Sequence, residues 1–213
     1  MIIDERLVTY MNSLQSDNTP LLQEIEQEAL ADYVPIIRKE TQNFLKLMLQ
    51  MNQPKRILEV GAAVGFSALL MEEYNPSDCK ITTIENYEKR IPIAKANFKR
   101  AHKEDVITLL EGDAQDVLPK LTEPYDFIFM DAAKGQYIYF WEEIKRLMKP
   151  GTILVTDNVL QDGDIIESHY AVTRRNRTIY KRMRDYLYEL THDSNYVCSI
   201  LPIGDGLAVC VKK

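Results

Sequence analysis

From residue 55 onward, short apolar segments rich in β-branched residues alternate with segments of helical periodicity. This alternation limits the possible folds more than any other feature of the chain, because it favours a parallel sheet covered by helices on both faces. Strands are predicted at 55–60, 80–85, 105–112, 125–131 and 152–158, and helices at 67–74, 87–101, 114–121 and 136–148.

The C-terminal part of the chain departs from this alternation. A long helix is predicted over about 171–192, and two apolar segments, 196–203 and 206–213, then flank a tight turn at Gly204–Asp205. Two strands joined in this way form an antiparallel hairpin. The expected fold is therefore α/β, with a doubly wound, mostly parallel sheet that ends in an antiparallel C-terminal hairpin.

Length and composition fit one domain. The chain has 213 residues, of which 46% are hydrophobic and 27% charged, as is usual for a globular domain. We expect a helical N-terminal extension over 1–50, broken near Asn18–Pro20 and Pro35, and a Rossmann-like core over 55–213.

Charge and cysteine content exclude some broad classes of protein. The formal charge of −6 gives no global indication of nucleic-acid binding, and no segment predicts a membrane span or a signal peptide. Cys79, Cys198 and Cys210 form no C-x-x-C pair. They are therefore expected to be reduced thiols of a cytoplasmic protein without membrane association.

Glycine and acidic residues lie at the ends of several predicted strands, where doubly wound sheets bind their ligands. Gly61 and Gly65 have G-x-x-x-G spacing, which does not match the dinucleotide fingerprint, and an ordinary turn explains them equally well. Glu85 ends the second predicted strand, where an acidic residue commonly binds the ribose of adenosine, and Asp113 could meet the adenine edge. Five positions would line one rim of the sheet: Glu59, Gly61, Glu85, Asp113 and Asp131.

Two apolar segments end in groups suited to a hard metal ion. In FIFMDAAK (127–134) the apolar run stops at Asp131, and Lys134 follows three residues later. In TILVTDNV (152–159) the apolar run stops at Asp157 and Asn158. Polar strand ends alone explain most such patterns. The three histidines lack metal-ligand spacing, so any metal would be a hard ion held by oxygen atoms.

The D-A-A-K motif at 131–134 and the T-D-N motif at 156–158 resemble those of the metal-dependent, class I S-adenosylmethionine O-methyltransferases, the family of catechol and caffeoyl-CoA enzymes. The resemblance extends from about Val34 to the C-terminus. The segments VPIIRKETQ, LEVGAAVGFSAL, DAAKGQY and TDNVL are most similar to bacterial members, the tRNA 5-hydroxyuridine methyltransferases among them. Animal catechol enzymes carry a Trp where this chain has Ala133, which weakens the case for a small catechol substrate.

This resemblance implies a seven-stranded sheet, a homodimer and a role for each motif residue. Asp131, Asp157 and Asn158 would bind a Mg²⁺-type ion, and Lys134 would act as general base, so that Lys134, Asp131 and Asp157 form the catalytic set. The cofactor S-adenosylmethionine would be bound by Ile36, Glu59, Gly61, Ser67, Glu85, Asp113, Ala114 and Asp131.

The segment TRRNRTIYKRMR (173–184) is strongly basic in an acidic chain. It carries six positive charges and no negative one, on Arg174, Arg175, Arg177, Lys181, Arg182 and Arg184. On a helix, four of them share the face opposite an apolar stripe formed by Ile179, Met183, Tyr186, Leu187 and Leu190. A basic ridge of this kind would bind an RNA backbone. A solvated helix face and a dimer interface remain alternatives.

The expected function is Mg²⁺-dependent methyl transfer to 5-hydroxyuridine in the tRNA anticodon loop, which gives 5-methoxyuridine. The 5-hydroxyl and the neighbouring C4 carbonyl of this base offer the same two vicinal oxygens as a catechol. A small catechol-like or CoA-linked phenol is the alternative substrate. A non-catalytic RNA-binding protein is the alternative from another class.

Overall fold

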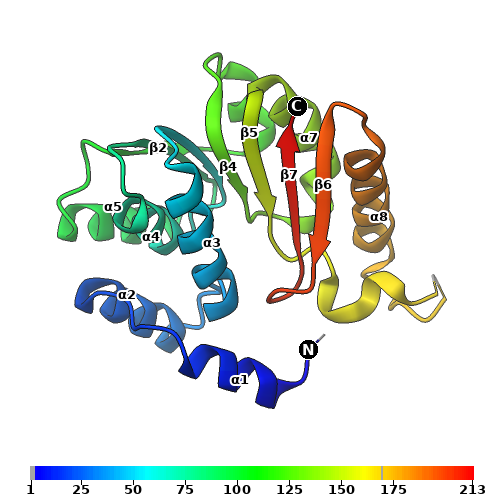
Figure 1. The fold of residues 1–213 in the computed structure, drawn as a ribbon, viewed down its shortest axis with the longest axis horizontal. Helices are drawn as coiled ribbons and strands as arrows, with labels where there is room; N and C mark the ends of the chain where they lie inside the picture. The colour runs from blue at the N-terminus through cyan, green and yellow to red at the C-terminus, as the bar shows by residue number, and fades with distance from the viewer. Residues whose placement is uncertain (1–2, 169) are drawn as a thin grey trace.

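The computed structural model describes residues 3–168 and 170–213. It contains a seven-stranded sheet with the order β3-β2-β1-β4-β5-β7-β6 (Figure 1). Strands β1 to β5 pair in parallel, whereas β7 pairs antiparallel with both β5 and β6. The predicted fold class is confirmed. The strands are β1 Arg56–Val60, β2 Lys80–Glu85, β3 Ile107–Glu111, β4 Tyr125–Met130, β5 Met148–Thr156, β6 Tyr196–Leu201 and β7 Leu207–Lys212.

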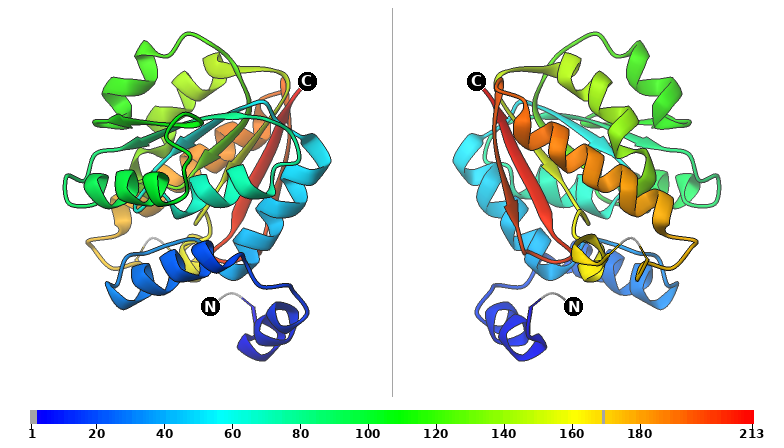
Figure 2. Two further views of the ribbon diagram at one scale, coloured as in Figure 1. Left: turned by 90° about the vertical axis from the view of Figure 1, so that its left-hand side faces the viewer. Right: turned by 90° about the vertical axis from the view of Figure 1, so that its right-hand side faces the viewer.

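Helices cover both faces of the sheet, because alternate residues of each central strand point to opposite faces. On β4, Ile128 and Met130 pack with α7 (Tyr137–Leu147) and α8 (Arg177–His192), whereas Phe127 and Phe129 belong to the core on the other side. That second core is covered by α2 (Pro20–Ala31), α3 (Lys39–Asn52), α4 (Phe66–Tyr74) and α5 (Ile91–Arg100). Two views at right angles show these layers (Figure 2).

The breaks in the N-terminal helical region fall where the sequence predicts them. Helix α1 (Glu5–Ser13) ends before Asn18, and Pro20 occupies the first turn of α2. Proline is tolerated there because the first helical N–H groups have no intrahelical partner. Pro35 lies in the extended segment between α2 and α3. Helix α1 buries none of its described side chains and projects from the body of the molecule (Figure 2).

Some expectations about local structure need correction. The last helix begins at Arg177 rather than near residue 171, so Arg174 and Arg175 lie in the turn before it. Cys198 and Cys210 face each other across β6 and β7 and form a disulfide, whereas Cys79 is free. The spacing of the cysteines contains no motif, but the hairpin register brings two of them together.

The helix after β3 is shorter than expected, with α6 (Ala114–Val117) followed by the 3₁₀ turn Leu118–Lys120. Pro92 lies in the first turn of α5, where its missing N–H would have no intrahelical partner. None of the helices in the described part of the chain is long and apolar enough to span a membrane.

Candidate active site

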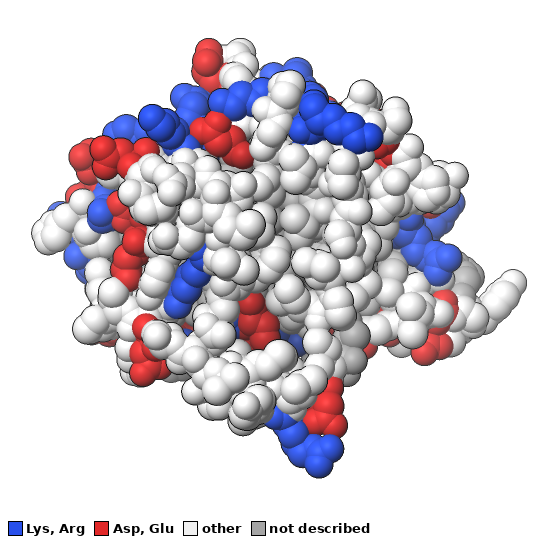
Figure 3. All heavy atoms as spheres, in the orientation of Figure 1, with Lys and Arg blue, Asp and Glu red and all other residues white. Residues whose placement is uncertain are grey.

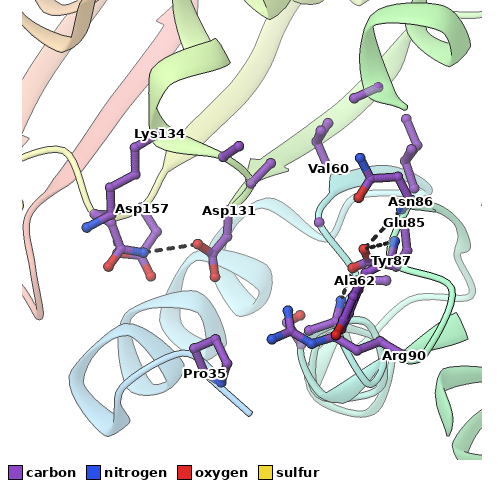
Figure 4. A pocket seen from close by; sticks show the side chains of 18 of the residues that line it. Pro35, Val60, Ala62, Glu85, Asn86, Tyr87, Arg90, Asp131, Lys134 and Asp157 are labelled. Atoms are coloured by element: carbon purple, nitrogen blue, oxygen red, sulfur yellow. Dashed lines mark hydrogen bonds between the residues drawn. The ribbon is translucent and has the colours of Figure 1, made fainter. Parts of the chain in front are cut away.

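A cavity of about 980 Å³ opens at the carboxyl ends of the parallel strands. Figure 3 shows acidic atoms within a hollow on this face, and Figure 4 shows how side chains from different loops converge around it. All but one of the predicted catalytic, metal-binding and cofactor-binding residues line it: Ile36, Gly61, Ser67, Glu85, Asp113, Ala114, Asp131, Lys134, Asp157 and Asn158. The parallel topology therefore brings together residues that are more than a hundred positions apart.

Glu59 is the exception. It is fully buried, does not line the cavity, and accepts a hydrogen bond from the Thr83 hydroxyl. Burial raises its pKa to about 7, although the polar side chains of Ser67 and Thr83 act in the opposite direction. Glu59 therefore lies behind the wall of the cavity, where it contacts Ser67, which does line it.

Asp131, Asp157 and Asn158 meet at one end of the cavity. The Asn158 side-chain amide donates to Asp131 Oδ1 at 3.0 Å, and the Asn158 backbone N–H donates to Asp157 Oδ1 at 2.7 Å (Figure 4). Asn158 has a φ of 61°, a left-handed conformation that asparagine tolerates better than most residues. The turn after β5 thus brings Asp157 and Asn158 to Asp131, which follows β4.

Both carboxyl groups are poorly solvated. Burial raises the pKa of Asp131 and of Asp157 above the usual carboxylate range, and the negative charge of Asp131 raises that of Asp157 further. The Asn158 hydrogen bonds and the charge of Lys134 oppose these shifts. Two buried carboxylates that repel each other are a favourable environment for a cation, because a bound cation compensates both charges.

The donor set fits a hard divalent ion. Among the described residues, no group of three His, Cys, Asp or Glu side chains is arranged to hold a metal. The predicted metal ligands do not form such a group, because only Asp131 and Asp157 are carboxylates and the third ligand is the amide carbonyl oxygen of Asn158. Oxygen donors of this kind, completed by water or substrate, suit Mg²⁺ rather than zinc.

Glu85 organises the opposite end of the cavity. Its carboxylate accepts three backbone N–H bonds, from Ala63 at 2.7 Å, Asn86 at 2.9 Å and Tyr87 at 2.8 Å (Figure 4). Gly61 has a φ of 105°, and a Cβ there would overlap the Asp131 carbonyl. Glycine is therefore required where the loop after β1 passes the loop after β4, which carries Asp131. Asp113 accepts the Gln115 N–H as the N-cap of α6 while it lines the cavity.

Sequence reasoning missed several residues that line the cavity. Asn86, Tyr87 and Arg90 follow Glu85, and the Arg90 guanidinium lies over the Tyr87 ring at 5.2 Å. Asp205, in the turn between β6 and β7, forms an ion pair with Lys134, with 2.8 Å between Nζ and Oδ2. The only sequence signal for Asp205 is the G-D-G turn, which predicts a hairpin but no site residue.

The basic segment adjoins the active-site loop. Arg182 donates to the Gly135 carbonyl at 3.1 Å and lies over the Tyr139 ring at 5.0 Å. Arg177 and Arg184 also bind nearby carbonyl oxygens, whereas Arg174, Arg175 and Lys181 are exposed. None of the six basic side chains forms an ion pair with an acidic residue in the described part of the chain. Of the two tyrosines that follow Lys134, Tyr137 is buried in the core, whereas Tyr139 is half exposed and offers a ring on which an RNA base could stack.

The chain is similar in sequence to a known protein family. The O-methyltransferase family profile matches residues 12–213. A catechol O-methyltransferase from Niastella koreensis is 36% identical over 130 residues, which is 59% of each chain. Caffeoyl-CoA O-methyltransferase 2 from Populus trichocarpa is 32% identical over 181 residues, 78% of this chain and 70% of that protein.

Solved structures agree. The O-methyltransferase from Bacillus cereus, in complex with SAH, has a TM-score of 0.85 and 26% identity, and the match covers 96% of each chain. The SAH-bound methyltransferase from Podospora anserina has a TM-score of 0.89 at 24% identity, covers 98% of this chain and 94% of that chain, and supports the fold. The chain therefore belongs to the O-methyltransferase family, the S-adenosylmethionine-dependent enzymes of the catechol and caffeoyl-CoA type.

Proposed function

We propose that this enzyme transfers a methyl group from S-adenosylmethionine to the 5-hydroxyl of 5-hydroxyuridine in tRNA, with Mg²⁺ as the metal. The observation that carries the proposal is the contact between the basic segment (173–184) and the loop that carries Lys134. Arg182 binds the carbonyl of Gly135, the residue after Lys134, so an RNA bound along the basic segment would lie beside the cavity.

Each end of the cavity has its own task. Glu85 and the loop it organises would bind the adenosine part of the cofactor, with Asp113 and Ala114 beside the base. Asp131, Asp157 and Asn158 would hold Mg²⁺ at the other end. When bound, the ion supplies positive charge that favours the ionised form of a hydroxyl and orients two vicinal oxygens.

The remaining chemistry falls to the protein. The cofactor carries its own leaving group, so the enzyme mainly aligns the hydroxyl oxygen with the methyl carbon. Lys134 Nζ, at the same end of the cavity as the carboxylates, would accept the hydroxyl proton. To do so it must be the neutral amine, so the ammonium that pairs with Asp205 first releases a proton to water, which the positive charge of a bound metal ion would favour.

A small phenol is the second candidate substrate. The relatives named above are a catechol and a caffeoyl-CoA O-methyltransferase, and a free catechol presents the same pair of oxygens. Ala133 is small and leaves the cavity mouth open, which suits a base in a nucleic-acid loop at least as well as it suits a free catechol.

Labelled S-adenosylmethionine distinguishes these candidates. We expect transfer of the label to tRNA that contains 5-hydroxyuridine, little transfer to free catechol, and loss of transfer in EDTA. Labelling of catechol alone would assign the small phenol as substrate. RNA binding without any labelling would indicate a non-catalytic RNA-binding protein.

Neutralising the exposed part of the basic segment tests RNA binding separately. The variant Arg174→Gln/Arg175→Gln/Lys181→Gln should bind tRNA more weakly and depend less on salt. The slope of log K against log salt is expected to fall by about 2 to 3, because each lost phosphate contact contributes about 0.7 to 0.9. Filter binding over a range of salt concentrations measures the slope.

A matched triple variant provides the control. Figure 3 shows Lys and Arg side chains also gathered across the upper end of the molecule. Lys55 precedes β1 and Lys213 follows β7, so both lie at the end of the sheet opposite the cavity, and Lys120 is exposed before β4. Changing these three to Gln should leave the slope nearly unchanged. The opposite pattern would place the RNA on that surface instead.

A further inference from the structure

Asp205 is a buried carboxylate at the edge of the active site. Its side chain is 2% exposed, and its two oxygens have different partners. Oδ2 accepts the Lys134 ammonium at 2.8 Å, and Oδ1 accepts the backbone N–H of Asp162. A buried carboxylate requires such partners, because an unpaired charge in the interior is costly. Asp205 therefore joins the Lys134 loop to the loop that follows Asn158.

Two backbone hydrogen bonds hold the turn that carries Asp205 against the segment after Asn158. The Val159 N–H donates to the Gly206 carbonyl at 3.0 Å, and the Leu160 N–H donates to the Asp205 carbonyl at 2.9 Å. Gly206 has a φ of 90°, and a Cβ there would overlap the Leu160 side chain. The position of the Asp205 carboxylate is thus fixed by the segment that also carries the proposed metal ligands.

Lys134 has three carboxylates within the influence of its charge but contacts one of them. Its charge acts on Asp131 and Asp157, yet Asp205 is its ion-pair partner among the described residues. An ammonium placed directly on Asp131 or Asp157 would occupy the oxygens that a cation needs. The contact with Asp205 keeps the ammonium away from those oxygens.

From this arrangement we infer that Asp205 is a positioning residue for Lys134: it holds the ammonium on the hairpin side of the cavity, so that Asp131 and Asp157 stay available to Mg²⁺ and Nζ stays beside the substrate. This inference rests on the proposed function of the same site. It assigns a role to the G-D-G turn, and it predicts that Asp205 affects metal binding without being a ligand.

Asp205→Asn tests the inference with little change in shape. An asparagine has one acceptor oxygen in place of two, so it can serve Asp162 or Lys134 but not both. We expect the variant to bind Mg²⁺ about tenfold more weakly by calorimetry, because the released ammonium competes for Asp131 and Asp157. We expect kcat to fall by about tenfold or more, because Nζ is no longer held in position, with little change in the affinity for S-adenosylmethionine.

The Lys134→Met background separates a role through Lys134 from a general structural role. If Asp205 acts through Lys134, then adding Asp205→Asn to Lys134→Met should change Mg²⁺ affinity by less than about twofold, since coupled residues are not additive. An equal loss of affinity in both backgrounds would overturn the inference. Asp162→Asn is the matched control, because it neutralises an exposed carboxylate of the same loop and keeps the backbone N–H that binds Asp205.

The measurements also separate this inference from the proposed function. A wild-type enzyme that neither binds Mg²⁺ nor transfers methyl groups would refute the proposed function and the inference with it. A wild-type enzyme that does both, together with an Asp205→Asn variant that behaves like it, would refute the role of Asp205 alone.

Discussion

Replacing Asp157 by Ala is expected to abolish metal-dependent methyl transfer and to leave cofactor binding nearly intact. Asp157 is 3% exposed and adjoins Asp131 and Asn158, so the loss of its carboxylate removes one of the three oxygen ligands proposed for the metal. We expect transfer to fall by about a thousandfold or more, because a bound metal contributes several kcal/mol of charge stabilisation. Transfer from labelled S-adenosylmethionine, measured with and without EDTA, gives the size of the loss.

The affinity for SAH, the demethylated cofactor, shows whether the variant is folded. Glu85 and its three backbone partners lie at the other end of the cavity, so calorimetry should give nearly the wild-type value. Asp157→Ala also removes the repulsion between the buried carboxylates of Asp131 and Asp157, so thermal stability without metal should not fall. Asp162→Asn, in the same loop, should keep full activity. An Asp157→Ala enzyme that works equally well in EDTA would refute the metal-dependent mechanism.

The layout of the sheet could be predicted because its signal is local. Apolar segments of strand length alternate with helical ones, and the last two strands flank a Gly-Asp turn, so element order and the antiparallel edge follow from short stretches of sequence. The carboxyl ends of parallel strands meet at one edge, which is why Asp131, Asp157 and Glu85 could be assigned to one cavity.

The other features depend on contacts between distant segments. Glu59 lies in β1, the strand that leads to Gly61, but its side chain points away from the cavity to Thr83 on the neighbouring strand. The Lys134–Asp205 pair joins residues 71 positions apart, and the cross-strand Cys198–Cys210 disulfide depends on the hairpin register. The start of α8 was misplaced because helical periodicity continues through Arg174 and Arg175, where the chain forms a turn.

Glu85→Ala should have the second largest effect, and on the cofactor rather than on the metal. The Glu85 carboxylate accepts hydrogen bonds from the N–H groups of Ala63, Asn86 and Tyr87, so alanine leaves three donors of the cavity wall without their acceptor. It also removes the group proposed to bind the ribose. We expect the Kd for SAH to rise about a hundredfold, since a hydrogen bond to a charged group contributes about 1.5–3 kcal/mol and more than one is lost.

Glu85→Gln separates the two roles of this carboxylate. Glutamine keeps the length of the side chain but offers one acceptor oxygen, so it can hold one side of the loop while its NH₂ faces the other donors. Its Kd for SAH should therefore lie between those of the wild type and Glu85→Ala. Glu88→Gln, an exposed change in the same loop, should bind normally. Mg²⁺ affinity should stay at the wild-type value in all three variants, because Asp131 and Asp157 are untouched. Normal SAH binding by Glu85→Gln and Glu85→Ala would show that the cofactor lies elsewhere in the cavity.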